Sequence, residues 1–289
     1  MIDYTIYAIP AFIALMAVEA LLLARTARRG YEARDTAASL AMGVGSLVVG
    51  IVAKAMHLAL LTLVARLAPV EIAPSWASWI ALLLLGDLAY YWFHRLSHEV
   101  RFLWAAHVNH HSSERYNLST ALRQSWTTGF TSMLFYWPLA LLGFPPAMIL
   151  AGIAINTVYQ FWIHTELIDR VGPLEAVLNT ASHHRVHHGT NPRYLDRNHG
   201  GMLIVWDRLF GTFEPEGEAV RFGLTHNIDT FNPLRIAFHE WQALAADVRS
   251  ARRWRDRLGH VFAGPGWMPA DRRRDSEPAG VAVPLKIYH

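Results

Sequence analysis

The stretch Thr180-Ala-Ser-His-His-Arg-Val-His-His-Gly-Thr-Asn191 places four histidines within six residues. Residues three or four positions apart share one face of a helix, so His184, His187 and His188 would direct their imidazole rings the same way. Neutral imidazole is a ligand for iron, copper, zinc and nickel. This stretch therefore predicts a metal site carried by a short helix.

Two further histidine clusters precede this stretch. His94 and His98 lie four residues apart, and His107 is followed by His110 and His111. One such pair would be a weak signal, because scattered surface histidines are the ordinary alternative. Three clusters in under a hundred residues predict metal ligation instead.

The composition is typical of a membrane protein. Of the 289 residues, 53% are hydrophobic and only 17% are charged, which is too little charge for an ordinary soluble enzyme. The chain has no cysteine, which excludes disulfides and thiolate metal sites. The net charge of +3 is small and the basic residues flank apolar segments, so no nucleic-acid partner is predicted.

Five apolar segments predict membrane helices, at residues 2–24, 36–67, 76–93, 126–142 and 147–163. The first is long enough to cross about 30 Å of hydrocarbon, and the last two form a hairpin that either crosses the membrane or re-enters it. Arginines follow the first segment, which predicts that its loop is cytoplasmic. Counting crossings from that loop puts every histidine cluster on the cytoplasmic side.

We therefore predict an all-α integral membrane bundle of four or five membrane helices with a cytoplasmic, histidine-rich helical cap. The expected parts are N-terminal membrane helices (1–75), a catalytic domain (76–230) and a C-terminal part (231–289) with an irregular tail. The C-terminal part contains a basic amphipathic segment, residues 233–259. Such a segment is typical of a helix that lies on anionic lipid, and a solvated helix face is the equal alternative.

The number of histidines predicts two metals, because one metal ion is held by four to six protein ligands. His164 ends the last apolar segment beside the cytoplasmic clusters and joins them. The expected ligands are His94, His98, His107, His110, His111, His164, His184, His187 and His188. An all-imidazole site without thiolate suits iron, while zinc and copper stay open on ligand type alone.

Two carboxylates are candidate site residues. Asp87 lies in the third apolar segment at helical spacing from His94, where a buried carboxylate is costly and is a functional candidate by default. We expect Asp87 to accept a hydrogen bond from a ligand imidazole. The alternative is a helix-packing hydrogen bond to a tyrosine or tryptophan. Glu166, two residues after His164, has the same two interpretations.

Two irons beside a bilayer favour activation of dioxygen for attack on a lipid C–H bond, since side chains cannot supply the electrons for that chemistry. Hydrolysis by a metal-bound hydroxide is the competing chemistry. Outside enzymes, a membrane metal transporter or a haem electron carrier could use paired histidines. Both would need ligands inside the spans on facing helices.

The three histidine clusters resemble the three-box pattern of the fatty acid hydroxylase/sterol desaturase superfamily. More narrowly, the sequences at 160–166, 182–188 and 204–213 resemble the alkylglycerol monooxygenase branch and its bacterial relatives. The resemblance carries over the nine histidines as ligands, His183 as a further site histidine and Glu166 as a site carboxylate. It also makes Trp206 and Asp207 part of a structural signature that closes over the site. One departure is His199, where relatives often carry tyrosine.

The resemblance implies a di-iron enzyme that hydroxylates or desaturates a lipid with O2. Hydroxylation next to an ether oxygen would cleave the ether, and in that branch a tetrahydropterin is the reductant. Any protein electron donor would be a separate chain. A sterol, carotenoid or ornithine-lipid hydroxylase or desaturase is the alternative within the superfamily. We expect the chain in a bacterial inner membrane, with its site facing the cytoplasm.

Overall fold

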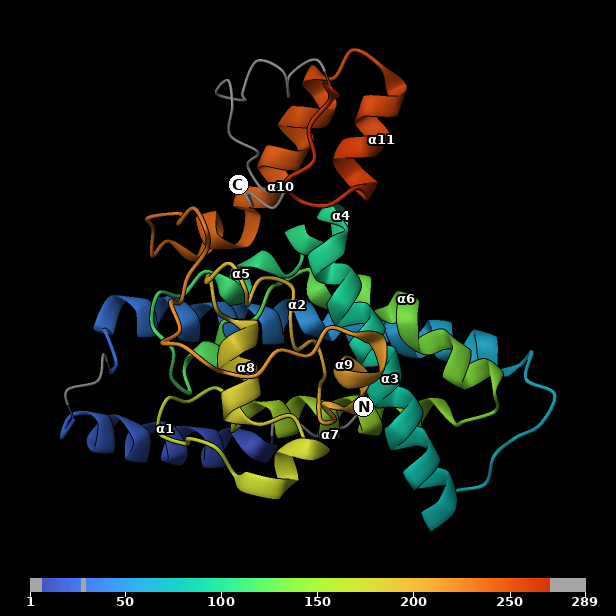
Figure 1. Cartoon of the computed structure of the whole chain (residues 1–289). Coiled ribbons are helices and arrows are strands. Elements are labelled where there is room, and N and C mark those ends of the chain that lie inside the picture. Colours follow the sequence, from blue (N-terminus) through green and yellow to red (C-terminus); the bar gives the residue numbers. More distant parts are fainter. Residues whose placement is uncertain (1–6, 27–29, 271–289) are drawn as a thin grey trace.

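The computed structural model describes residues 7–26 and 30–270, and within them the chain is helical without a β-strand (Figure 1). One isolated antiparallel bridge joins Leu178 and Leu203. The helices are α1 (Ile9–Leu23), α2 (Ala33–Ala65), α3 (Trp76–Glu99), α4 (Arg101–Ala105), α5 (Val108–His111), η2 (Thr120–Leu122), α6 (Thr128–Leu141), α7 (Pro146–Phe161), η3 (Gly172–Ala176), α8 (Ala181–His187), α9 (Val205–Phe210), α10 (Pro233–Ser250) and α11 (Trp254–Phe262). The predicted all-α class is therefore confirmed for the described residues.

The long apolar helices form a bundle in which α6 packs against both α2 and α3, and α7 packs against α2 and α3. The buried core of this bundle consists of Leu61, Leu82, Tyr136, Leu139, Ala140, Phe144, Met148 and Ile149. The histidine-bearing segments lie outside this core. They are α8, α5 and the end of α3, which gather on one side of the bundle beneath α10 and α11 (Figure 1).

Local sequence signals explain where the two longest helices begin and where α3 ends. The side chain of Glu32 accepts hydrogen bonds from the backbone N–H groups of Arg34 and Asp35, which caps α2. Ser75 and Ser78 form a reciprocal capping box at the start of α3. Val100 has an extended backbone and stops α3 immediately after His98 and Glu99. The chain can therefore turn back and bring His107 and His111 toward the end of α3.

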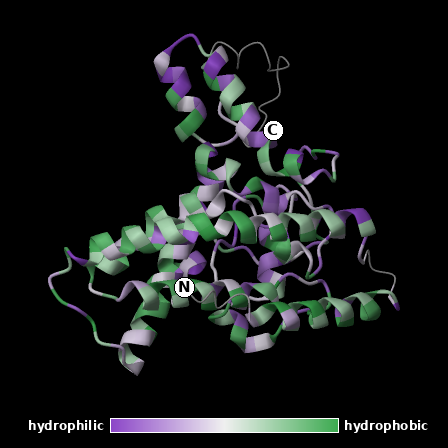
Figure 2. Ribbon diagram, turned by 180° about the vertical axis from the view of Figure 1, so that it is seen from behind, coloured by the Kyte–Doolittle hydropathy of each residue, from purple (hydrophilic) through white to green (hydrophobic). Residues whose placement is uncertain are grey.

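Two helices, α2 and α3, are long and apolar enough to cross a membrane by length and composition. Figure 2 shows the apolar residues of the bundle, and many of those on α2, such as Val48 and Ile51, are exposed. α1 and α7 are apolar but have only 15 and 16 residues. Sixteen residues span about 24 Å, less than the hydrocarbon core. The predicted count of four or five membrane helices is therefore not confirmed.

Two predicted segments differ from the observed elements. The first apolar segment is helical from Ile9, whereas residues 2–6, Arg28 and Arg29 lie outside the described residues, as do residues 271–289 of the tail. The single amphipathic helix expected at 233–259 is wrong, because the chain breaks between α10 and α11. Ala251 and Arg253 are extended, and the Arg101 side chain of α4 holds α10 through Glu240 and Asp247.

Buried polar contacts attach the first two helices to the histidine-bearing loops. Glu19 of α1 accepts hydrogen bonds from the Leu118 backbone N–H and from the hydroxyl of Thr165, which follows His164. Asp35 of α2 accepts a hydrogen bond from the fully buried Arg123. These carboxylates therefore anchor the chain just after α5 and just after His164.

Candidate metal centre

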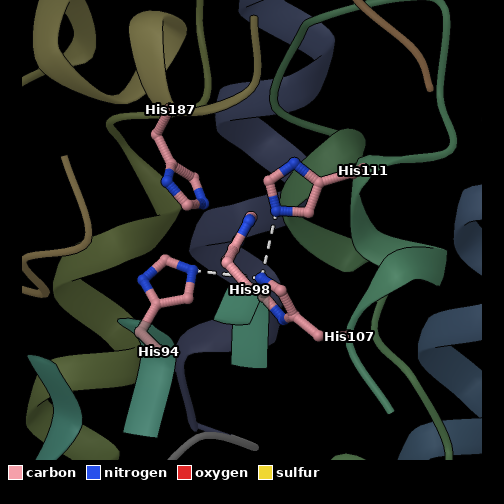
Figure 3. A group of neighbouring side chains, drawn as sticks. All are labelled: His94, His98, His107, His111 and His187. Atoms are coloured by element: carbon pink, nitrogen blue, oxygen red, sulfur yellow. Dashed lines mark hydrogen bonds between the residues drawn. The ribbon is translucent and has the colours of Figure 1, made fainter. Parts of the chain in front are cut away.

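The nine predicted histidines converge in two buried groups. One group contains His94, His98, His107, His111 and His187, and the other contains His110, His164, His184 and His188. Within each group, the potential ligand atoms all lie within 4.8 Å of one another. Figure 3 shows the five-histidine group, whose rings point toward a common centre from α3, α8 and the two ends of α5.

Neighbouring histidines of one sequence cluster serve different groups, which corrects the expectation that each cluster directs its rings one way. His107 and His111 join the five-histidine group, whereas His110 between them joins the other. His187 likewise separates from His184 and His188. Adjacent helical residues differ by about 100° in direction, so a short helix between two sites can contribute to both.

The spacing of the ring nitrogens fits a metal ion in each group. Nε2 of His107 lies 3.1 Å from Nε2 of His94 and 3.0 Å from Nε2 of His111. In the second group, Nε2 of His164 lies 3.1 Å from Nε2 of His110 and 3.0 Å from that of His184. Metal–imidazole bonds of about 2.1 Å at right angles place neighbouring nitrogens about 3.0 Å apart. The spacing of the donors in each group therefore fits a metal ion.

Backbone carbonyls fix the tautomer of three of these rings. Nδ1 of His94 donates to the carbonyl of His199 at 2.8 Å, Nδ1 of His187 to that of Arg197 at 3.0 Å, and Nδ1 of His164 to that of Gln160 at 2.7 Å. A carbonyl only accepts, so each Nδ1 carries the proton and each Nε2 keeps its lone pair. These lone pairs converge, which is unfavourable unless a cation lies between them.

The segment Asp196–His199 contacts three histidines of the five-histidine group. It supplies the two carbonyls that bind His94 and His187, and a carboxylate oxygen of Asp196 lies 3.7 Å from Nδ1 of His98. Asp196 and Asn198 both have left-handed backbones, with φ of 54° and 56°. This conformation turns successive polar groups of a short segment toward the site. Aspartate and asparagine are among the residues that tolerate it best.

Two side chains hold this segment in place. The Asn198 amide donates to the carbonyls of His183 and Glu214. Asp207 accepts hydrogen bonds from the backbone N–H groups of His199 and Gly200. Asp207 is buried, and desolvation raises its pKa to about 6 against the lowering effect of these hydrogen bonds. Its position agrees with the expected role of the 204–213 sequence as a structural closure over the site.

Burial favours the neutral form of His107, His110, His111 and His187. Desolvation, followed by repulsion from neighbouring imidazoles, lowers the pKa of His107, His111 and His187 well below the usual range. Desolvation also lowers the pKa of His110 to about 4. The neutral ring is the form that binds a metal ion, so at neutral pH these four histidines require no deprotonation before binding.

The contact expected for Asp87 is wrong, because its two oxygens accept hydrogen bonds from groups other than imidazole. The donors are the Asn156 amide, the backbone N–H groups of Met202 and Leu203, and the Trp206 indole. The helix-packing alternative, which included a bond to tryptophan, describes this arrangement. Asp87 joins α3 to α7 and to the segment before α9, at a place where a side chain on Gly201 would collide with it.

The other predicted site residues lie outside both histidine groups. Glu166 lines a surface cleft of about 690 Å³ together with Asp169, Arg170 and Arg185. His183 is buried with its ring edge against Phe213, at a centroid distance of 5.4 Å. Catalytic roles for Glu166, His183 and Asp87 therefore remain predictions.

Sequence reasoning missed Asp196 and the role of His199. Asp196 shows no helical spacing to the histidine clusters, so the pattern that identified the other residues does not include it. His199 is fully buried, with its ring 5.1 Å from that of His98 and 5.6 Å from that of His187. The available signal was the density of Asp, Asn and His residues between the last cluster and Gly200.

Comparisons with known proteins point to one family. Residues 79–212 match the model of the fatty acid hydroxylase family. The chain is 50% identical over 196 residues to the alkylglycerol monooxygenase of Homo sapiens and 52% identical over 199 residues to that of Danio rerio. It is also 32% identical over 149 residues to an ornithine lipid hydroxylase of Rhizobium tropici.

The matches cover 68% and 69% of this chain for the two alkylglycerol monooxygenases and 50% for the ornithine lipid hydroxylase. The chain spans less than half the length of these relatives, namely 44%, 44% and 45%. No solved structure is significantly similar to the chain.

Proposed function

The chain belongs to the fatty acid hydroxylase/sterol desaturase superfamily, in its alkylglycerol monooxygenase-like branch, and on this basis we propose that it is a membrane-bound di-iron oxygenase that hydroxylates a lipid with O2. The observation that carries the proposal is the convergence of nine buried histidines in two groups. A hydrolase is less consistent with these groups, because every donor in them is a neutral imidazole.

Iron is the metal that best suits both the donor set and the family. We propose one ion in each histidine group, hence two per chain. When bound, the iron pair supplies the redox chemistry that activates O2. The chain's own residues do the rest. The backbone carbonyls of Arg197 and His199 keep the ligand lone pairs directed inward, and burial of both groups excludes bulk water from the reaction.

We propose that the apolar chain of the substrate lies in the bundle of α2, α3, α6 and α7, with the carbon to be oxidised held next to the metals. Tyr90 of α3 lies between the bundle and the site. Its ring packs against that of His94 at 5.2 Å, and its hydroxyl donates to Gln160 of α7. Positioning of one carbon would determine the regiochemistry. If that carbon adjoins an ether oxygen, the hydroxylated product collapses and the ether is cleaved.

The relatives named alkylglycerol monooxygenase favour an ether lipid as substrate, and we propose this class first. The similarity to an ornithine lipid hydroxylase favours hydroxylation of an aminoacyl lipid as the second candidate. Sterols and carotenoids have no such observation in their favour. By analogy with the first class, we propose a tetrahydropterin as reductant, with a separate electron-donor protein as the alternative.

The two long apolar helices and the family of the chain indicate that it is a membrane protein. We propose in addition that α1, α6 and α7 complete a bundle of four or five membrane helices, and that the histidine groups face the cytoplasm. We also propose three parts of the chain: N-terminal membrane helices (1–75), a catalytic domain (76–230) and a C-terminal part (231–289). The relatives at 40–52% identity are animal proteins, so they give no support to the earlier expectation of a bacterial inner membrane.

The test is an oxygenase assay on purified, iron-loaded protein with a tetrahydropterin. We expect oxygen-dependent release of a fatty aldehyde from an alkylglycerol and no product from a matched acylglycerol. His187→Ala should abolish the product, whereas His226→Ala, an exposed histidine outside both groups, should not. An ornithine lipid that gains one oxygen, with the ether lipid untouched, would select the second candidate. Turnover without O2 or iron would refute the proposal.

A further inference from the structure

The short C-terminal helix α11 presents an apolar stripe to solvent. Trp254, Leu258 and Phe262 follow one another at four-residue intervals, and their exposed fractions are 65%, 46% and 63%. Residues spaced in this way lie on one face of a helix. Because large apolar side chains are normally covered, a row of three on one short helix indicates an interaction surface.

The opposite face of α11 is already occupied. A side chain on Gly259 would collide with the Trp267 ring, and the ring of His260 lies 5.1 Å from that of Trp267. α11 also packs against α10 and α4. The orientation of α11 is therefore fixed by the protein, and the stripe of Trp254, Leu258 and Phe262 (the α11 stripe) is left facing outward.

Exposed arginines surround the α11 stripe. Arg255 and Arg257 flank it within the helix, and Arg249, Arg252 and Arg253 precede it. All five are exposed, and the only acidic residue within 249–262 is Asp256, which falls on the far side of the helix from the stripe. A row of apolar side chains bordered by cations complements a surface that is apolar beneath and anionic above. That surface is a membrane leaflet that contains acidic phospholipid.

The place of α11 in the fold agrees with this occupant. In both views, α11 lies on the side of α10 toward the loop between α2 and α3 (Figures 1 and 2), and the exposed apolar residues Leu67 and Trp76 flank that loop. α10 buries Ile236, Ala237 and Leu244, and its exposed apolar residues, Leu234 and Phe238, lie in its first two turns, at the end of α10 away from the break before α11. The break at Ala251 frees α11 to follow a different direction.

We propose that α11 is an interfacial anchor that inserts Trp254, Leu258 and Phe262 into the headgroup region of an anionic membrane while the flanking arginines bind lipid phosphates. The anchor fixes the histidine-bearing cap against the membrane through the Arg101 contacts of α4 with α10. This surface is distinct from both histidine groups, so its test does not depend on the proposed reaction.

The chain contains no cysteine, which allows a single label without other changes. In the full-length Leu258→Cys variant, an environment-sensitive fluorophore is attached to the new cysteine. The labelled protein is placed in nanodiscs of phosphatidylcholine, with or without phosphatidylglycerol. A lipid that carries a nitroxide near its headgroup serves as the quencher. The matched control is Asp256→Cys on the opposite face of the same helix. We expect roughly twofold or greater quenching at position 258 in the anionic discs and little at position 256.

A second variant tests the contribution of the arginines that flank the α11 stripe. Arg255→Gln/Arg257→Gln in the Leu258→Cys background should weaken docking roughly tenfold and make quenching depend less on phosphatidylglycerol, with iron content unchanged. Equal quenching at positions 256 and 258, or none at 258 in anionic discs, would overturn the proposal. So would efficient cross-linking of Leu258→Cys between two copies without quenching, which would identify the stripe as a protein interface.

Discussion

The carboxylate of Asp196 lies 3.7 Å from Nδ1 of His98, and both side chains are buried. His98 is a member of the five-histidine group, so this pair joins a candidate metal ligand to an acidic partner. At this distance the contact is electrostatic rather than a hydrogen bond, and the negative charge favours a cation bound to the ring. The carboxylate next to a candidate ligand is thus Asp196 rather than Asp87, and it lies on the left-handed segment that also binds His94 and His187.

Replacement of Asp196 by asparagine should weaken iron binding in the five-histidine group about 10- to 100-fold, because the ring of His98 loses its charged partner. Asparagine tolerates the left-handed backbone, so the fold should persist. The measurement is iron release to a competing chelator. Asp229→Asn is the matched control, since Asp229 also has a positive φ but is exposed and belongs to neither histidine group. Equal release from both variants would remove Asp196 from the site.

Asp87→Ala should lower the free energy of unfolding by about 3 kcal/mol, because it leaves the donors of Asn156, Met202, Leu203 and Trp206 without their acceptor. Thermal unfolding in detergent measures the loss of stability, and Asp169→Ala, a substitution at an exposed aspartate, is the control. A variant of unchanged stability that binds iron normally but has lost all activity would contradict the structural role and restore the catalytic one.

Asp35→Ala should destabilise the protein by about 3–5 kcal/mol, because Arg123 would remain buried without a counter-charge. Removing both charges, as Asp35→Ala/Arg123→Met, should cost less than the single substitution. The comparison of the two unfolding midpoints is the test. A double variant that is less stable than Asp35→Ala would show that Arg123 is held chiefly by its hydroxyl partners, Ser39 and Ser112.

His183 should make the protein sensitive to acid. Burial lowers its pKa to about 4, whereas an unfolded histidine titrates near 6.5. Between these values the unfolded chain binds the extra proton, so the free energy of unfolding falls as the pH drops from about 6.5 to about 4. This group contributes roughly 3 kcal/mol over that window. His183→Gln should flatten the pH profile of stability, and exposed His226→Gln should not. An unchanged slope in His183→Gln would show that this ring titrates normally.

Helical class and histidine convergence were predictable from sequence because both depend on regular patterns. Long apolar runs predict helices, and clusters at three- and four-residue spacing predict ligands. The partition of His107, His110 and His111 between two groups was not predictable, since it depends on where a four-residue helix lies between two centres.

Tertiary contacts account for the other differences. Asp87 seemed a partner of histidine because helical spacing aligns the two, but spacing cannot reveal that the 202–206 segment folds against α3 and supplies its own donors. The break between α10 and α11 likewise follows from packing on α4, which a hydrophobic pattern does not report.

The most direct test of the central claim is metal analysis with Mössbauer spectroscopy on detergent-purified protein grown with iron-57, for the wild type and for His107→Ala and His110→Ala. We expect two irons per chain in the wild type and the selective loss of a different iron site in each variant, because the two histidines belong to different groups. A single zinc, or the same spectral change in both variants, would contradict it.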